Sequence, residues 1–457
     1  MSLLRTPPAR PAAGTDGGDR PRRGRPPARN EILRAGRLGG VDPDQLALEY
    51  GTPLYAYDLD VVTRQVDALR SALPGRFEIA YAVKANPSLG VVAHLGGHEI
   101  GADVASLGEL RTALRAGIPA GRIVMTGPGK RDEELRSAVE AGIRAITVES
   151  PGELRRLERI AADRSTSGPA VPVLLRSAVP AARALERVRL VGDDGAGKFG
   201  MDRADLAEAA RAAAASTTLE LLGIHAFGAS NVTDASALAA HVEETLELAS
   251  EVARTAGTSF SLVDVGGGLG IPYESGDESL DLVGFGRLLR AISGRWAADP
   301  GVGAARVLLE PGRFLVGPAG AYVARVVDRK TVDGRAIAIL DGGIHHVLRP
   351  VLVGQEHRVR RLTGRNGVEG TARFAPVTIA GPLCSGLDVF ATEAMLQPPE
   401  PGDLVAVLDV GAYGFTESMP FFLSHALPAE VAIRGGRAML LRPRLEPETW
   451  LEWQRLP

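Results

Sequence analysis

The chain has 457 residues, which suggests two or three domains, or one large barrel with a smaller partner domain. Hydrophobic residues make up 45% and charged residues 23%, the composition of a soluble globular protein. The net charge of −3 argues against a dedicated nucleic-acid binder, and the single cysteine, Cys384, excludes an internal disulfide and a cysteine-rich zinc site. With no apolar run of membrane-spanning length and no apolar core at its start, the chain is expected to be cytoplasmic, without a metal, membrane or nucleic-acid partner.

Residues 1–30 differ in composition from the rest of the chain. They contain seven arginines and six prolines but only two aspartates. Such a segment buries too little apolar surface to offset the entropy of ordering, which predicts a disordered basic tail. A dispensable extension is the simpler interpretation, and docking to an anionic surface is the alternative.

Residues 31–57 precede a strand–helix alternation, and their segment Pro53–Tyr57 is expected to lend a strand to a later β domain. In residues 58–318, short β-branched runs alternate with helical stretches such as Arg131–Ala141 and Ala204–Ala214, a pattern typical of a parallel (β/α)8 TIM barrel. An open doubly wound sheet is the alternative, but no GxGxxG follows the first strand. The predicted barrel strands are Phe77–Val83, His98–Val104, Arg122–Thr126, Arg144–Val148, Val171–Leu175, Leu219–Phe227, Ser261–Val265 and Arg306–Leu309.

The pattern changes in residues 319–457, where strand-like runs recur with few helical stretches. This predicts an all-β C-terminal domain, a β-sandwich or β-barrel. Its predicted strands are Ala321–Val327, Arg335–Leu340, Ala372–Ala380, Leu404–Val410, Ala429–Ile433 and Arg437–Leu441.

Polar residues follow the predicted barrel strands where those strands end, and such groups gather at one mouth of a TIM barrel. They are Lys84, Asp103, Arg176, His225, Ser230, Gly266–Gly270 and Glu310–Arg313. A glycine-rich turn can cradle a phosphate, a lysine with a depressed pKa can form a Schiff base, and a carboxylate can keep a pyridinium nitrogen protonated. Each motif alone also fits a tight turn or a surface ion pair, but together they match the needs of pyridoxal 5′-phosphate (PLP).

The segment Tyr81–Asn86 resembles the lysine motif of the barrel-type PLP decarboxylases, the group of the diaminopimelate, ornithine and arginine decarboxylases. Further motifs resemble that family in its own order: Gly101–Ser106, Lys198–Gly200, Asp264–Gly268, Glu310–Arg313, Gly381–Asp388 and Gly411–Gly414. The resemblance covers roughly residues 45–440. It implies a barrel plus a β domain, and a homodimer whose active sites are completed across the interface.

The resemblance also implies roles for individual residues. Lys84 would form the Schiff base with PLP, Glu310 would face the pyridine nitrogen, and Cys384 of the partner subunit would reprotonate the substrate Cα. The implied phosphate ligands are Ser230, Gly267, Gly268, Arg313 and Tyr413. Other residues implied at the cofactor are Asp103, Arg176, His225, Phe227 and Gly312. The implied substrate contacts are Arg313, Arg349, Ser385 and Asp388.

Four departures from the family pattern concern the substrate. Phe227 stands where the family has a histidine stacked on the cofactor, and Ser385 replaces the acidic residue that follows the cysteine. Val353 and His425–Leu427 replace a tyrosine and an Arg-Pro-Arg segment of the diaminopimelate enzymes. With these changes the sequence resembles decarboxylases of specialised metabolism, some of which act on an aminoacyl group held by a carrier protein.

Three alternatives remain open from the sequence. The first is a diaminopimelate decarboxylase proper. The second is an amino-acid racemase of the same fold, which Glu310 disfavours because racemases place an arginine at the pyridine nitrogen. The third is a non-catalytic homologue, which the presence of Lys84 and Cys384 disfavours.

Overall fold

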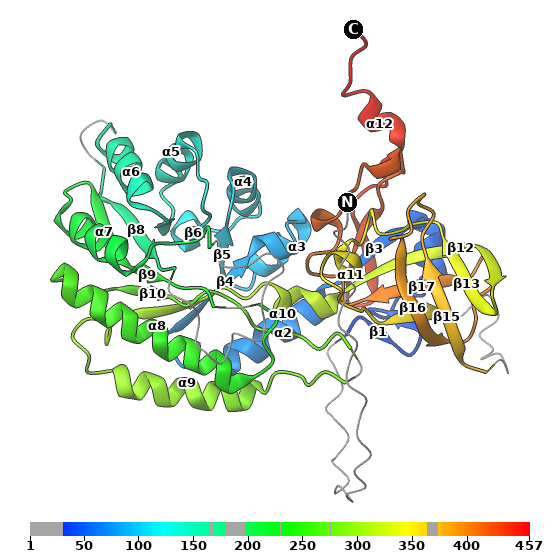
Figure 1. The fold of residues 1–457 in the computed structure, drawn as a ribbon, viewed down its shortest axis with the longest axis horizontal. Helices are drawn as coiled ribbons and strands as arrows, with labels where there is room; N and C mark the ends of the chain where they lie inside the picture. Colours follow the sequence, from blue (N-terminus) through cyan, green and yellow to red (C-terminus); the bar gives the residue numbers. More distant parts are fainter. Residues whose placement is uncertain (1–30, 164–167, 179–196, 229, 275, 363–372) are drawn as a thin grey trace, which may run out of the picture.

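A computed structural model describes residues 31–163, 168–178, 197–228, 230–274, 276–362 and 373–457. The predicted tail, residues 1–30, lies outside the described residues. Two units lie side by side, a barrel ringed by helices and a sheet-rich unit (Figure 1). Among the described residues, no helix combines the length and apolar character needed to cross a membrane.

Eight parallel strands form the closed barrel, in which β11 pairs with β4 to complete the circle. All eight predicted strands are present, so the TIM barrel is confirmed and the open sheet is excluded. The barrel strands are β4 Phe77–Ala82, β5 Gly101–Val104, β6 Ile123–Met125, β7 Ala145–Val148, β8 Val171–Arg176, β9 Leu219–His225, β10 Leu262–Asp264 and β11 Arg306–Leu309.

Helices cover the outside of the barrel (Figure 1). They are α2 Leu59–Ala72, α3 Leu89–Gly96, α4 Leu107–Arg115, α5 Asp132–Ala141, α6 Pro151–Asp163, α7 Arg203–Ala215, α8 Ala235–Ala256 and α9 Leu282–Trp296. Side chains along each barrel strand alternate between two cores, because successive residues of a strand point to opposite faces of the sheet. In β4, Ile79 and Tyr81 belong to the large core, while Ala80 belongs to a separate cluster with Val124 and Leu308 inside the barrel.

The second unit contains a nine-stranded sheet built around β12. The predicted N-terminal strand is confirmed: β3 (Leu54–Asp58) pairs antiparallel with β12 and parallel with β18. The other strands are β12 Gly320–Val332, β13 Arg335–Leu340, β14 Val359–Leu362, β15 Ala375–Ala380, β16 Val389–Leu396, β17 Leu404–Leu408, β18 Ala429–Arg434 and β19 Arg437–Arg442.

Sequence patterns missed β14 and β16. The central residues of β14 are two arginines, and those of β16 include an exposed glutamate, so neither segment reads as an apolar run. Short elements complete the described chain. They are β1 Leu33–Arg34, β2 Arg37–Leu38, α1 Pro43–Tyr50, α10 Arg313–Val316, α11 Arg349–Leu352, α12 Pro447–Leu451 and the 3-10 turns η1 Val83–Ala85, η2 Ala120–Arg122, η4 Gly317–Ala319, η5 Phe415–Glu417 and η6 Phe422–Ser424.

Candidate active site

A pocket lies at the C-terminal ends of the barrel strands, where Tyr413 of the β domain meets the barrel. Nine of the twelve predicted cofactor residues line it. The lining residues are Ala82, Lys84, Phe227, Ser230, Gly267, Gly268, Leu269, Glu310, Gly312, Arg313 and Tyr413. The pocket therefore brings together, from five separate segments, the lysine, the carboxylate, the arginine and the glycine-rich turn that the sequence places at strand ends.

Lys84 lies on η1, directly after β4, and its Nζ donates to Oδ2 of Asp103 at 3.0 Å. Asp103 is almost fully buried, and its other oxygen accepts from the Thr126 hydroxyl at 2.7 Å. The expectation of a depressed lysine pKa is not met in the protein alone. Desolvation would lower the pKa of Lys84, but attraction to Asp103 and Glu310 outweighs it and raises that pKa. Lys84 therefore rests as an ammonium held by Asp103.

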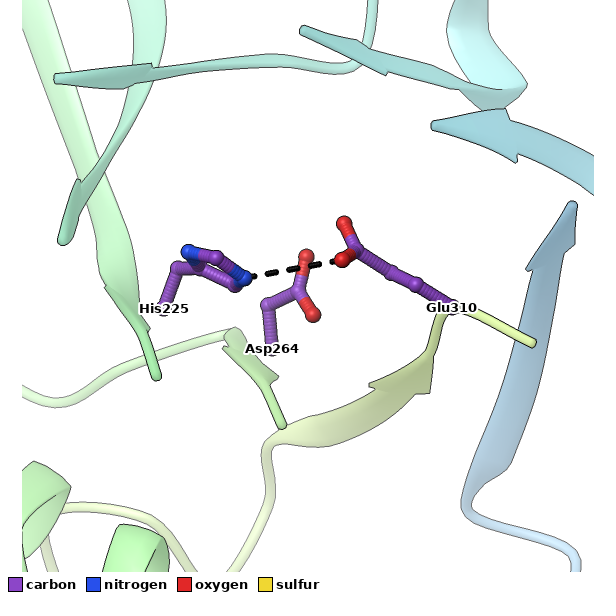
Figure 2. A group of neighbouring side chains, drawn as sticks. All are labelled: His225, Asp264 and Glu310. Atoms are coloured by element: carbon purple, nitrogen blue, oxygen red, sulfur yellow. Dashed lines mark ion pairs between the residues drawn. The ribbon is translucent and has the colours of Figure 1, made fainter. Parts of the chain in front are cut away.

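Three buried polar side chains lie together next to the pocket, and Glu310 is the one that lines it: His225 at the end of β9, Asp264 at the end of β10 and Glu310 after β11 (Figure 2). His225 Nε2 lies 3.5 Å from Glu310 Oε2. Burial alone would raise the pKa of Glu310, but the attraction of His225 and hydrogen bonding to it lower that pKa to about 2. Glu310 is therefore a carboxylate, and its Oε1 meets no donor among the described residues.

The glycine-rich turn after β10 packs closely against the backbone that follows β11. A Cβ on Gly267 would lie 2.3 Å from the Glu310 carbonyl oxygen, and one on Gly312 would lie 2.8 Å from Cβ of Ala85. Gly266 and Gly268 have φ values of 66° and 99°, which favour glycine. Glycine is thus required here by both the turn and the close approach, and the result is a concave backbone surface.

Arg313 is held in a fixed orientation beside that turn. It is buried, its Nη1 donates to the Tyr273 hydroxyl at 2.6 Å, and its Nη2 donates to the Ser230 hydroxyl at 3.2 Å. Its guanidinium carbon lies 4.8 Å from the centre of the Tyr413 ring. A guanidinium, a hydroxyl and a glycine turn that converge on one pocket form a pre-organised anion site.

These features fit PLP on structural grounds. Glu310 Oε1 is a buried acceptor that has no donor within the described ranges of the chain, which suits it to a protonated ring nitrogen. The glycine turn and Arg313 suit a phosphate, Lys84 suits the aldehyde carbon, and the Phe227 ring lines the same pocket. One possible ligand atom from each of His225, Asp264 and Glu310 lies within 4.8 Å of the other two, a spacing that a cation could also bridge. The lysine and the phosphate cradle beside them favour PLP.

Of the four predicted substrate residues, Arg313 lines the pocket, and Arg349, Ser385 and Asp388 do not. Arg349 on α11 is buried; its Nη1 donates to Glu417 Oε2 at 2.7 Å and its guanidinium lies 4.9 Å from the Tyr413 ring centre. Tyr413 therefore has a guanidinium of Arg313 and one of Arg349 against its ring. Because Arg349 already has a carboxylate partner, the protein itself neutralises the charge of this predicted substrate contact.

The Cys384 loop contributes no residue to the lining of the pocket in its own chain. The Cys384 thiol is exposed and does not line the pocket. The neighbouring Ser385 hydroxyl accepts from the Leu387 N–H at 3.2 Å. Asp388 is buried, and its two oxygens accept from the backbone N–H groups of Ile344 and Leu383 at 2.8 and 2.7 Å. The geometry thus gives Asp388 the task of shaping this loop, and it does not favour the predicted substrate contact.

Arg176 is a predicted cofactor residue that pairs with another side chain and does not line the pocket. Its Nη1 donates to Glu149 at 2.8 Å, its guanidinium carbon lies 4.5 Å from the Phe199 ring centre, and it does not line the pocket. Asp103 and His225 also do not line the pocket. Asp103 contacts Lys84, and His225 contacts Glu310, two residues that do line it. Asp264 had no predicted role, although its position near the end of a predicted strand, two residues before three glycines, was a usable signal.

Comparisons with known proteins agree with this site. Residues 59–317 match the family model described as pyridoxal-dependent decarboxylase, pyridoxal binding domain. The chain therefore belongs to the pyridoxal-dependent decarboxylases, and it is an amino-acid decarboxylase that uses PLP.

The chain is similar to a diaminopimelate decarboxylase of Methanothermobacter thermautotrophicus, at 33% identity over 92% of this chain and 95% of that one. It is similar to an L-glutamyl-[BtrI acyl-carrier protein] decarboxylase of Niallia circulans, at 31% identity over 87% of this chain and 92% of that one. The crystal structure of diaminopimelate decarboxylase from M. jannaschii aligns with a TM-score of 0.85, at 27% identity over 94% of this chain and 98% of that one.

Proposed function

We propose that this enzyme removes the α-carboxyl group of an amino acid or aminoacyl group whose far end carries no free ammonium. The observation that carries the proposal is the Arg349–Glu417 ion pair at 2.7 Å beside Tyr413. This pair has no net charge, and Ser385 adds only a hydroxyl. A distal ammonium would find no unpaired carboxylate at these positions, and desolvating it would cost several kcal/mol. A neutral, acylated end would not carry this desolvation cost.

Similarity to the L-glutamyl-[BtrI acyl-carrier protein] decarboxylase supports an acylated substrate, since a glutamyl group attached to a carrier has one carboxyl converted to an acyl linkage. Similarity to the diaminopimelate decarboxylases supports the second candidate, diaminopimelate itself. The two candidates differ in the charge at the far end of the substrate, so a comparison of substrates separates them.

The pocket residues have distinct tasks in this scheme. Lys84 must lose a proton from Nζ before it can hold PLP covalently, and Asp103 at 3.0 Å is the adjacent acceptor. Ser230, Arg313 and the glycine turn would bind the phosphate, and Glu310 would keep the ring nitrogen protonated. Bound PLP supplies the electron sink for the pair of electrons left on Cα as CO2 departs.

The acid that protonates Cα is proposed to be the partner subunit's Cys384. Two facts support a second subunit: this thiol is exposed and away from its own pocket, and apolar side chains near it and after Tyr413 are exposed. Leu387 is 62% exposed and Phe421 43%. Exposed apolar groups of this kind are typical of a surface that another subunit covers. The proposed assembly is a homodimer with shared sites.

A substrate panel tests the proposed function. Released CO2 is measured with free L-lysine, L-ornithine, meso-diaminopimelate and L-glutamate, and with glutamyl and other aminoacyl groups loaded on an acyl carrier protein. The acylated substrates should have the highest kcat/KM. In a Ser385→Glu variant, activity on the diamino substrates should rise, whereas the matched Ser385→Ala control should not change it. If wild type prefers diaminopimelate, the proposed substrate class is wrong; if Cα protons exchange without CO2 release, the enzyme is a racemase.

Two further measurements test the assigned residues. Borohydride reduction of the holoenzyme and peptide mapping should place the pyridoxyl label on Lys84; a label on Lys198 or Lys130 would contradict the assignment. Lys84→Ala and Cys384→Ala variants should each be inactive, and mixing them should restore activity if Cys384 acts across the dimer. No restoration, with dimer exchange verified, would place Cys384 in its own subunit's site.

A further inference from the structure

Asp264 is fully buried at the end of β10, and its two carboxyl oxygens have different surroundings. Oδ1 accepts from the Gly266 N–H at 2.9 Å, at the start of the glycine turn. Oδ2 is buried and meets no N–H or O–H donor in the part of the chain that the structure describes. An ionised carboxylate with a donorless buried oxygen is costly, which favours a proton on this group.

The groups that face Asp264 strengthen this argument. Glu310 and His225 lie beside it, within 4.8 Å atom to atom (Figure 2). Asp103 of β5 and Lys84, which follows β4, form an ion pair at 3.0 Å, and His241 of α8 is hydrogen-bonded to the Val265 carbonyl. Two carboxyl groups this close in a buried site do not both ionise readily.

The two carboxyls titrate in opposite directions. Burial raises the pKa of Asp264 well above its usual value, and the negative charge of Glu310 raises it further. The pKa of Glu310 is lowered by His225, as described above. The proton of the pair therefore belongs on Asp264.

We propose that Asp264 is a positioning residue that acts as a neutral carboxylic acid, donating its O–H to Glu310 while its other oxygen anchors Gly266. One side chain then links the carboxylate that would meet the cofactor's ring nitrogen to the turn that would hold its phosphate. The remaining lone pairs of Glu310 stay available to the ring nitrogen, including those of Oε1, for which the described part of the chain supplies no donor. The His225–Glu310 contact at 3.5 Å would also help to hold the carboxylate.

An Asp264→Asn variant separates a neutral donor from an ionised carboxylate. Its amide N–H can donate to Glu310 and its carbonyl can accept from Gly266, but it cannot ionise. Asp264→Leu has the same branched arrangement of four side-chain heavy atoms and can do neither. PLP is titrated into cofactor-free protein and followed by visible absorbance. We expect Asp264→Asn to bind PLP within about threefold of wild type and Asp264→Leu to bind at least about tenfold more weakly, a loss of about 1.4 kcal/mol or more.

The pH dependence of stability gives a readout that packing alone would not move. A raised pKa in the folded state means that wild type loses stability, relative to a group that cannot ionise, as pH rises above the aspartate's unfolded value near about 4. The Tm of Asp264→Asn minus that of wild type should therefore increase between pH 4 and pH 7. Asp42→Asn, at the partly exposed N-cap of α1, is the matched control and should show no such trend.

Three outcomes would overturn the proposal. In the first, Asp264→Asn loses PLP affinity as severely as Asp264→Leu. In the second, the Tm difference is flat or falls with pH. In the third, cofactor-free wild type binds Zn2+ tightly and Asp264→Asn abolishes that binding, which would make the cluster a metal site. If Asp264→Leu does not fold, infrared spectroscopy of wild type at pH 7 decides: a protonated carboxyl band lost in Asp264→Asn supports the proposal, and its absence refutes it.

Discussion

Replacement of Gly267 by alanine is the most direct structural test of the proposed cofactor site. The new Cβ would lie 2.3 Å from the Glu310 carbonyl oxygen, whereas real Cβ contacts begin at 3.0 Å, so the two backbones must separate by about 0.7 Å (3.0 − 2.3). Gly267 does not have a positive φ, so its backbone conformation suits alanine. The penalty therefore comes from this contact alone.

The contact lies between the glycine turn and the residue that would meet the ring nitrogen. Forcing a methyl group into packed structure costs about 1–3 kcal/mol. Because the displaced backbone carries Glu310, we expect the cost to appear in PLP binding, as a rise in Kd of about 5- to 150-fold. Titration of the cofactor-free protein with PLP, followed by visible absorbance, measures the change, and circular dichroism verifies the fold.

Gly294 supplies the matched control. It lies exposed in α9, where an added Cβ would meet nothing within 4 Å. Gly294→Ala should leave PLP affinity unchanged and, because alanine favours helices, should stabilise the protein by up to about 1 kcal/mol. Equal PLP affinity in Gly267→Ala and wild type would refute the view that this turn and Glu310 form a tight cofactor cradle.

Three other changes have defined outcomes. Glu310→Gln should still bind PLP but slow single-turnover CO2 release about 10- to 100-fold, because a charge-assisted hydrogen bond to the ring nitrogen is lost; an unchanged rate would contradict the assignment. Lys130→Met should lower the free energy of unfolding by about 3–5 kcal/mol in urea titrations, because it removes the partner of Glu153 from a buried ion pair of 2.8 Å. Adding Glu153→Gln should recover part of this loss, and no recovery would argue that the unpaired charge is not its cause. Burial lowers the pKa of His357 to about 4, below its unfolded-state pKa near about 6.5. The stability of the folded protein should therefore fall by about 2 kcal/mol between pH 7 and pH 5, as the unfolded state takes up the proton. A His357→Gln variant that loses stability as steeply as wild type over that range would disprove this.

The fold class was predictable because it depends on local patterns. Short β-branched runs such as Phe77–Ala82 and Arg306–Leu309 are buried on both faces in a barrel, so they read as continuous apolar strands between helical stretches. The strand ends then placed Lys84 and Glu310 at one mouth, since all strands of a parallel barrel point the same way. The edges of the β domain were not predictable in this way, since β14 and β16 owe their pairing to neighbours rather than to their own apolar content.

Which polar group meets which was decided only by the tertiary structure. Arg349 and Glu417 are 68 residues apart in the chain, and nothing local shows that this arginine is already neutralised. Arg176 pairs with Glu149 instead of reaching the pocket, and Asp388 uses both oxygens on backbone N–H groups of its own surroundings. Side-chain identity at a strand end gives the chemistry available there. Its charge state and its partner depend on burial and on contacts between distant segments, which come into being only when the chain folds.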